Sequence, residues 1–181
     1  MSAAPLNAVT LDHAWIEAHI PHSGAMCLLD GVEAWDDTRI QCTATSHRDP
    51  HNPLRSRGRL AAACGIEYAA QAMAVHGALV GACGREGGEG GEGGAESRPR
   101  VGFLASVRGV EAQVARLDTL PGPLTIEAER LSGDGTSVLY AFTVRCGAQT
   151  LLAGRAAVML DASGRLPGGG SGPATIKGEP S

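Results

Sequence analysis

Apolar and polar positions alternate in several short segments of this chain, and one long segment is apolar on nearly every side. Residues 38–46 (TRIQCTATS) place Ile40, Cys42 and Ala44 between polar neighbours, which predicts a half-buried strand. Further segments with strand character follow the long apolar one at 101–117, 124–131, 137–146 and 150–160. Short Gly-containing turns separate the last three of these, so they predict an antiparallel meander.

The long apolar segment, residues 60–83, predicts a buried helix because it is rich in Ala and has no polar face. A shorter helix is predicted at 11–20, where Pro21 ends it. Residues 24–35 are interpreted as an apolar approach followed by a turn. A single apolar helix needs cover on several sides, so the order of elements predicts an α+β domain in which an antiparallel sheet wraps around one long central helix.

The predicted domain spans residues 1–160. Within it, residues 85–100 (REGGEGGEGGAESRPR) are of low complexity and cannot bury apolar surface, which predicts a disordered Gly-rich insertion. Residues 161–181 are rich in Gly, Pro and Ser and predict a disordered tail.

Composition and charge exclude several classes of protein. A net charge of −4 argues against a nucleic-acid binder, which would need a basic face. Five widely spaced cysteines without a CxxC pair predict neither a disulfide framework nor a metal site. The apolar run 60–84 is long enough to span a bilayer, but Glu67, Gln71 and His76 interrupt it. No secretory signal is visible, so we expect a cytoplasmic protein without a membrane partner.

Glu67 is the one charged residue between Leu60 and Gly84. An ionised carboxylate in apolar surroundings costs several kcal/mol unless it has a partner, so such a residue either shifts its pKa or finds one. At helical spacing Glu67 shares a face with Gln71, and this face holds no second charge. A role in a functional site is therefore one interpretation, and a carboxylate that faces water or pairs with Arg59 is the other.

Three segments in order carry a resemblance to a known family: IPHSGAMCLLDGVEAW at 20–35, GIEYAAQAMA at 65–74 and VGFLASVRGVEAQVARLDTLPGPL at 101–124. They resemble the β-hydroxyacyl-acyl carrier protein dehydratases, which have the hotdog fold. The chain particularly resembles the dehydratase-like proteins of aryl polyene biosynthesis, where an Asn-Pro pair precedes the helix that bears the Glu, as in HNPL at 51–54. The resemblance covers about residues 19–160.

The resemblance implies a reaction and its partners. The substrate would be a 3-hydroxyacyl chain on the phosphopantetheine arm of an acyl carrier protein, in fatty-acid or polyene biosynthesis, and loss of water would give a trans-2-enoyl thioester. No cofactor of the protein's own is implied. Two domains would pair, as a homodimer or as a heterodimer with another hotdog dehydratase, with active sites at their interface. Glu67 would help to expel the hydroxyl group, and a raised pKa would keep it protonated for that step.

Other site residues follow from the same resemblance. Gly102, Phe103 and Leu104 begin the strand that would line the substrate tunnel and bind the pantetheine amides by extending the sheet. Gln71 would hydrogen-bond Glu67 or order a water molecule. The family carries its catalytic His in a Gly-His-Phe-Pro loop, which this chain lacks.

Two histidines of the shortened loop are candidates for the base that removes the C2 proton, His51 first and His47 second. A solvated loop histidine is the alternative interpretation of each. His22 matches the Pro-His pair of the family's opening segment, and we interpret it as structural.

Three functions are therefore open. The first is a 3-hydroxyacyl-thioester dehydratase. The second, which the shortened loop favours, is a non-catalytic hotdog subunit that pairs with an active dehydratase. The third is an acyl-thioester thioesterase, in which a similar helix carboxylate activates water.

Overall fold

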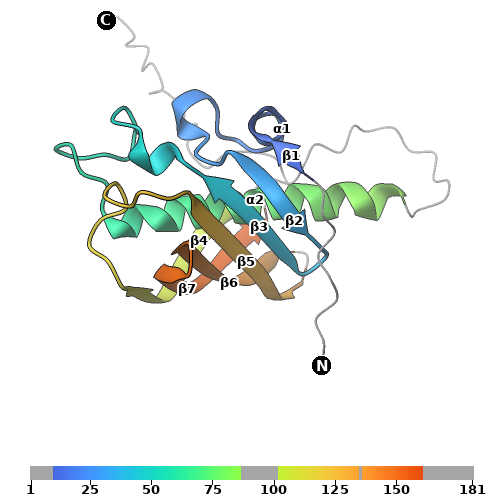
Figure 1. Cartoon of the computed structure of the whole chain (residues 1–181). Helices are drawn as coiled ribbons and strands as arrows, with labels where there is room; N and C mark the ends of the chain where they lie inside the picture. Colours follow the sequence, from blue (N-terminus) through green and yellow to red (C-terminus); the bar gives the residue numbers. More distant parts are fainter. Residues whose placement is uncertain (1–9, 87–101, 135, 161–181) are drawn as a thin grey trace, which may run out of the picture.

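The computed structural model describes residues 10–86, 102–134 and 136–160 (Figure 1). In this part of the chain seven strands form one antiparallel sheet in the order β1-β2-β3-β5-β6-β7-β4. Their bounds are β1 Leu11–Asp12, β2 Gly31–Trp35, β3 Arg39–Ala44, β4 Gly102–Ala112, β5 Leu124–Gly133, β6 Ser137–Cys146 and β7 Gln149–Leu160. The consecutive pairing of β5, β6 and β7 confirms the predicted meander.

Two α-helices accompany the sheet, α1 (His13–His19) and α2 (Gly65–Glu86), and α2 runs along one face of it (Figure 1). Three short 3₁₀ turns also occur: η1 Gly24–Met26, η2 Ser46–Arg48 and η3 Ala62–Cys64. One face of α2 and alternate residues of β3, β5 and β6 are buried together in a single core. This is the predicted hotdog arrangement of a sheet wrapped around one long helix. None of the helices within the described residues is long and apolar enough to cross a membrane.

Small residues let the start of α2 lie close to the sheet. A Cβ atom added at Gly65 would lie 2.8 Å from Cδ2 of Leu152 in β7, so only glycine fits there without displacement of the leucine. Ala69 and Ala72 of α2 are fully buried as well. The Ala-rich composition that predicted the helix therefore also sets its distance from the strands.

The structure corrects two of the predicted elements. Residues 24–35 are not only a turn, because they hold η1 and the strand β2, which pairs with β3. The five residues of β2 do not alternate regularly between buried and exposed positions, so their own sequence does not predict a strand. They form one because they pair with β3. The long helix begins at Gly65 instead of residue 60 and extends to Glu86, so the first two residues of the predicted insertion are helical.

The remaining boundary predictions stay predictions. The rest of the Gly-rich insertion and the tail 161–181 lie outside the described residues. The long strand β4 bends at Gly109, where the backbone has a φ of +58° and the register with β7 shifts.

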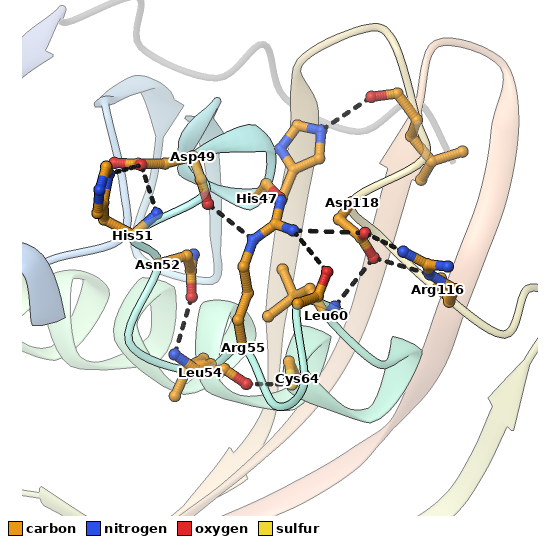
Figure 2. Close-up of polar contacts among 12 residues, drawn as sticks. His47, Asp49, His51, Asn52, Leu54, Arg55, Leu60, Cys64, Arg116 and Asp118 are labelled. Carbon is orange, nitrogen blue, oxygen red and sulfur yellow. Dashed lines mark hydrogen bonds and ion pairs between the residues drawn. The ribbon is translucent and has the colours of Figure 1, made fainter.

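An ionic cluster fastens the loop between β3 and α2 to the connection between β4 and β5 (Figure 2). Asp118 accepts hydrogen bonds from the backbone N–H of Leu60 at 2.9 Å and from the guanidinium group of Arg116, and its Oδ2 lies 3.5 Å from Nη1 of Arg55. Arg55 also donates to three backbone carbonyls of the loop, those of His47, Asp49 and Gly58. The loop that leads into α2 is therefore held by Asp118 at Leu60 and by Arg55 at three of its own carbonyl groups.

Candidate functional site

Glu67 lies in the first turn of α2, where the aligned peptide dipoles favour a negative charge. Its Oε1 is 3.1 Å from Nε2 of His22, and the side chains are 31% and 27% exposed respectively. His22 follows Pro21 in the segment between α1 and η1. The structure thus brings a carboxylate and an imidazole together at a position that solvent or a ligand can reach.

Gln71, one turn after Glu67, connects this pair to the segment that carries His22. Its Nε2 donates to Oε1 of Glu67 at 3.0 Å and to the carbonyl of Met26 at 2.8 Å. Its Oε1 accepts the backbone N–H of Leu28 at 2.9 Å. Gln71 is fully buried, and its amide is satisfied at both ends. The predicted hydrogen bond between Gln71 and Glu67 is therefore confirmed.

The expected raised pKa of Glu67 is wrong. The hydrogen bond from His22 lowers the pKa of this carboxyl, and the bond from Gln71 adds to the effect, while partial burial opposes both. The net direction is downward because two donors meet one oxygen and outweigh the loss of hydration. Glu67 is therefore ionised near neutral pH. Among the described residues none donates to its Oε2, so one carboxylate oxygen is left for a ligand.

The two nitrogens of His22 have different surroundings. Nδ1 is buried and has no hydrogen-bond partner among the described residues, whereas Nε2 faces the carboxylate. A carboxylate only accepts hydrogen bonds, so Nε2 carries the hydrogen that joins the two groups. Nε2, which contacts Glu67, is thus the imidazole nitrogen that can take part in a reaction at this site.

His47 and His51, the predicted partners of Glu67, lie elsewhere (Figure 2). His47 is fully buried in η2, where Nε2 is 3.3 Å from the carbonyl oxygen of Leu120, and burial lowers its pKa. The side chain of His51 is 91% exposed, and its Nδ1 is 3.3 Å from Oδ1 of Asp49. The structure brings neither imidazole into contact with Glu67, and it places His22 there instead.

The sequence contained a signal for His22. The Pro-His pair stands in one of the three segments that carry the family resemblance, and Ser23 and Gly24 follow it with a tight turn. That match to the opening segment led to the interpretation of His22 as structural, and the structure places it against Glu67 instead. Gln71 of α2 holds the segment that carries His22 by its bonds to Met26 and Leu28.

The three residues predicted to bind substrate, Gly102, Phe103 and Leu104, form the start of β4. They pair with the end of β7 on one side, and β4 is the last strand of the sheet, so its other edge has no neighbour within the described residues. Leu104 is 40% exposed. No hydrogen bond or ion pair joins these residues to Glu67 among those described, so their role stays a prediction.

The arrangement of Glu67 and His22 has a chemical consequence: a base and a hydrogen-bond donor lie next to each other on one chain.

A comparison with known protein families identifies the family of this chain. Residues 14–163 match the ApeP-like family, described as ApeP dehydratase. The chain belongs to the ApeP-like dehydratase family. No curated protein matches it.

Solved structures agree with this assignment. The chain is similar to a chain of the dehydratase heterocomplex ApeI:P from Xenorhabdus doucetiae, with 25% identity, a TM-score of 0.67, and coverage of 82% of this chain and 91% of that one. A thioesterase from Haemophilus influenzae has 13% identity and a TM-score of 0.56, over 87% of this chain and 95% of that one. A mutant thioesterase from Pseudomonas aeruginosa has 14% identity and a TM-score of 0.54, over 86% and 98%. The two thioesterases show only that the hotdog fold is shared.

Proposed function

We propose that this member of the ApeP-like dehydratase family removes water from 3-hydroxyacyl thioesters carried on the phosphopantetheine arm of an acyl carrier protein, in fatty-acid or polyene biosynthesis. The observation that carries the proposal is the contact of 3.1 Å between Nε2 of His22 and Oε1 of Glu67. An acid–base pair is what the elimination of water from a thioester requires.

The ionised state of Glu67 assigns the roles. Oε2 of Glu67 takes the proton from C2 of the substrate, and the electrons of that C–H bond form the C2=C3 double bond. The C3–O bond breaks, and the hydroxyl group leaves as water with the Nε2 proton of a doubly protonated His22, which becomes a neutral imidazole with its hydrogen on Nδ1. Glu67 then returns its proton to His22 through their shared hydrogen bond, so the pair regains its starting state. Glu67 is thus the base and His22 the acid, whereas the resemblance implied that Glu67 would expel the hydroxyl group and that His51 or His47 would be the base.

We further propose that the chain works with a second hotdog dehydratase subunit. The similar dehydratase structure is a heterocomplex, which supports a heterodimer. The open edge of β4 supports it too, because an unpaired edge strand is a ready site for another chain. Leu104 and Val110 of β4 are 40% and 39% exposed, and Met159 of the adjacent β7 is 53% exposed. A partner strand at this edge would lie beside Leu104 and Val110, the two exposed large hydrophobic residues of β4.

The test is an assay of the hydration and dehydration of a 3-hydroxyacyl-acyl carrier protein by the full chain, alone and co-expressed with a hotdog dehydratase. Glu67→Gln and His22→Asn are each expected to lower the rate by about 10²–10⁴-fold, as loss of a positioned acid or base does. His51→Asn is the matched control, since this exposed His pairs only with Asp49, and it should keep the wild-type rate. Full activity of Glu67→Gln would refute the proposal. Activity that depends on the partner's site alone would identify a non-catalytic subunit.

A thioesterase is the second candidate function, and the lowered pKa of Glu67 favours it. An ionised carboxylate with one free oxygen can activate a water molecule for attack on a thioester carbonyl as well as it can accept a proton from C2. The release of free thiol from an acyl thioester separates the two functions. Thiol release that Glu67→Gln abolishes, without formation of an enoyl product, would decide for the thioesterase.

A further inference from the structure

We propose that Tyr68 and Ser46 are positioning residues that hold His22 against Glu67 by fixing the backbone at Leu28. For its effect on turnover this inference rests on the proposed function, but the contacts themselves do not. Neither side chain touches the carboxylate of Glu67, so both act through the segment that carries His22.

Leu28 is held at both of its backbone polar groups. Its N–H donates to Oε1 of Gln71 at 2.9 Å, and its carbonyl accepts the hydroxyl of Ser46 at 2.7 Å. The two side chains come from different elements, Gln71 from α2 and Ser46 from η2. Leu28 itself is buried, with 1% of its surface exposed. A backbone position held from two sides in the core cannot move without breaking a buried hydrogen bond.

The hydroxyl of Ser46 is in turn oriented by Tyr68. The two hydroxyl oxygens are 3.0 Å apart, and Nδ2 of Asn52 donates to the oxygen of Tyr68 at 3.0 Å. Ser46 donates its one hydroxyl hydrogen to the carbonyl of Leu28. Tyr68 must therefore donate to Ser46, and it accepts from Asn52. This gives the chain of bonds a single direction, from Asn52 through Tyr68 and Ser46 to Leu28. It also gives the Asn-Pro pair of the HNPL segment a role, which the acid–base pair alone does not.

The segment between Leu28 and His22 is stiff enough to transmit this restraint. In η1 the N–H of Met26 donates to the carbonyl of Ser23 at 3.2 Å, and the carbonyl of Met26 accepts from Gln71. The N–H of Gly24 donates to Oε1 of Glu17 at 2.5 Å, which ties the turn to α1. The orientation of the imidazole is therefore set by contacts beyond its own.

Few charges besides His22 act on Glu67. Asp30 and Cys64 lie near enough to Tyr68 to influence its phenol, and Glu17 is engaged at Gly24. Among the described residues His22 is the titratable group whose charge lowers the pKa of Glu67. The titration of Glu67 therefore responds to the placement of His22, whose hydrogen bond is the largest influence on it, ahead of burial and the bond from Gln71.

The experiment compares two variants that each remove one buried phenolic hydroxyl from the full chain. Tyr68→Phe breaks the chain of bonds to Leu28. Tyr140→Phe is the matched control, because Tyr140 is 4% exposed and its hydroxyl lies 2.9 Å from Nδ1 of His76. In the described part of the chain, no hydrogen bond or ion pair joins His76 to His22 or Glu67. Carbon NMR follows the titration of the Glu67 carboxyl, which is assigned by its absence in Glu67→Gln.

The expected result is an upward shift of the pKa of Glu67 in Tyr68→Phe, because the hydrogen bond from His22 that lowers this pKa would be weakened. Tyr140→Phe should leave this pKa unchanged. An unchanged pKa in Tyr68→Phe, or an equal shift in both variants, would overturn the inference.

A second pair of variants keeps the test decisive if Tyr68→Phe does not fold. Ser46→Ala removes the hydroxyl that holds Leu28 and should shift the Glu67 titration upward, whereas Ser46→Thr keeps a hydroxyl and should restore it. The titration needs no turnover. An inactive wild type in which Tyr68 still controls Glu67 would sink the proposed function and leave the positioning role in place. An active wild type in which Tyr68→Phe and Ser46→Ala leave the Glu67 titration unchanged would support the proposed function and overturn the positioning role.

Discussion

Removal of the Asp118 carboxylate is expected to weaken the fold at the point where α2 begins. Leu60, whose backbone N–H donates to Asp118, is fully buried, so its N–H would be left without a partner in Asp118→Ala. An orphaned buried donor costs about 1–3 kcal/mol. Arg55, with a side chain 13% exposed, would lose its acidic neighbour as well. Breaking a buried ion pair from one side costs about 3–5 kcal/mol, and the partial exposure of Arg116 argues for the lower end.

We therefore expect Asp118→Ala to lower the free energy of unfolding by about 3 kcal/mol. Asp118→Asn keeps one oxygen that can still accept from Leu60, so its loss should be smaller, about 2 kcal/mol. Urea unfolding followed by tryptophan fluorescence measures both, and a loss of 2 kcal/mol should move the midpoint by about 1 M. Asp37→Asn is the control, because it removes the same charge from an exposed residue. A loss in Asp118→Ala no larger than in this control would refute the reasoning.

The same carboxylate should make stability depend on pH. The hydrogen bonds from Arg116 and Leu60 hold the pKa of Asp118 well below its ordinary value of 3.8, although its burial acts the other way. The unfolded chain therefore binds a proton at a higher pH than the folded chain does. The stabilisation is complete above the ordinary carboxyl range and is lost as the pH falls below it. The difference between wild type and Asp118→Asn should accordingly shrink in acid.

Two further predictions concern α2 and the core. Gly77→Ala should raise the free energy of unfolding by about 1 kcal/mol, since its new Cβ has open space in an exposed helix position. Gly65→Ala should lower it by about 1–3 kcal/mol, because its Cβ would press on Leu152. Thermal unfolding compares the two, and melting temperatures that move in the same direction would contradict the packing described for α2. Burial lowers the pKa of His76, whose Nδ1 meets the hydroxyl of Tyr140, so wild type should lose stability as the pH falls below the ordinary histidine pKa. In His76→Gln the free energy of unfolding, measured by urea unfolding at several pH values, should fall less steeply as the pH falls. The same pH dependence in wild type and variant would contradict the role given to His76.

Much of the fold could be predicted because its signals are local. The strand β6 begins and ends at Ser137 and Cys146, as the alternation of apolar residues indicated. The antiparallel meander followed from short turns, and the buried helix followed from Ala-rich composition. β2 was missed because its five residues have an irregular burial pattern, and a register shift interrupts its pairing with β3. Such a strand forms because it pairs with its neighbour, and its own sequence has no strand pattern that would predict it.

The candidate site divides in the same way. The sequence by itself determined Glu67 and Gln71, since a lone charge in an apolar helix and a polar residue four positions later share a face by helical geometry alone. Only the tertiary structure decided that His22, and neither His47 nor His51, meets the carboxylate. It also decided that the pKa of Glu67 is lowered. The physical reason is that both depend on His22, a donor from a segment more than forty residues before Glu67, and Gln71 of α2 and Ser46 of η2 hold that segment at Leu28.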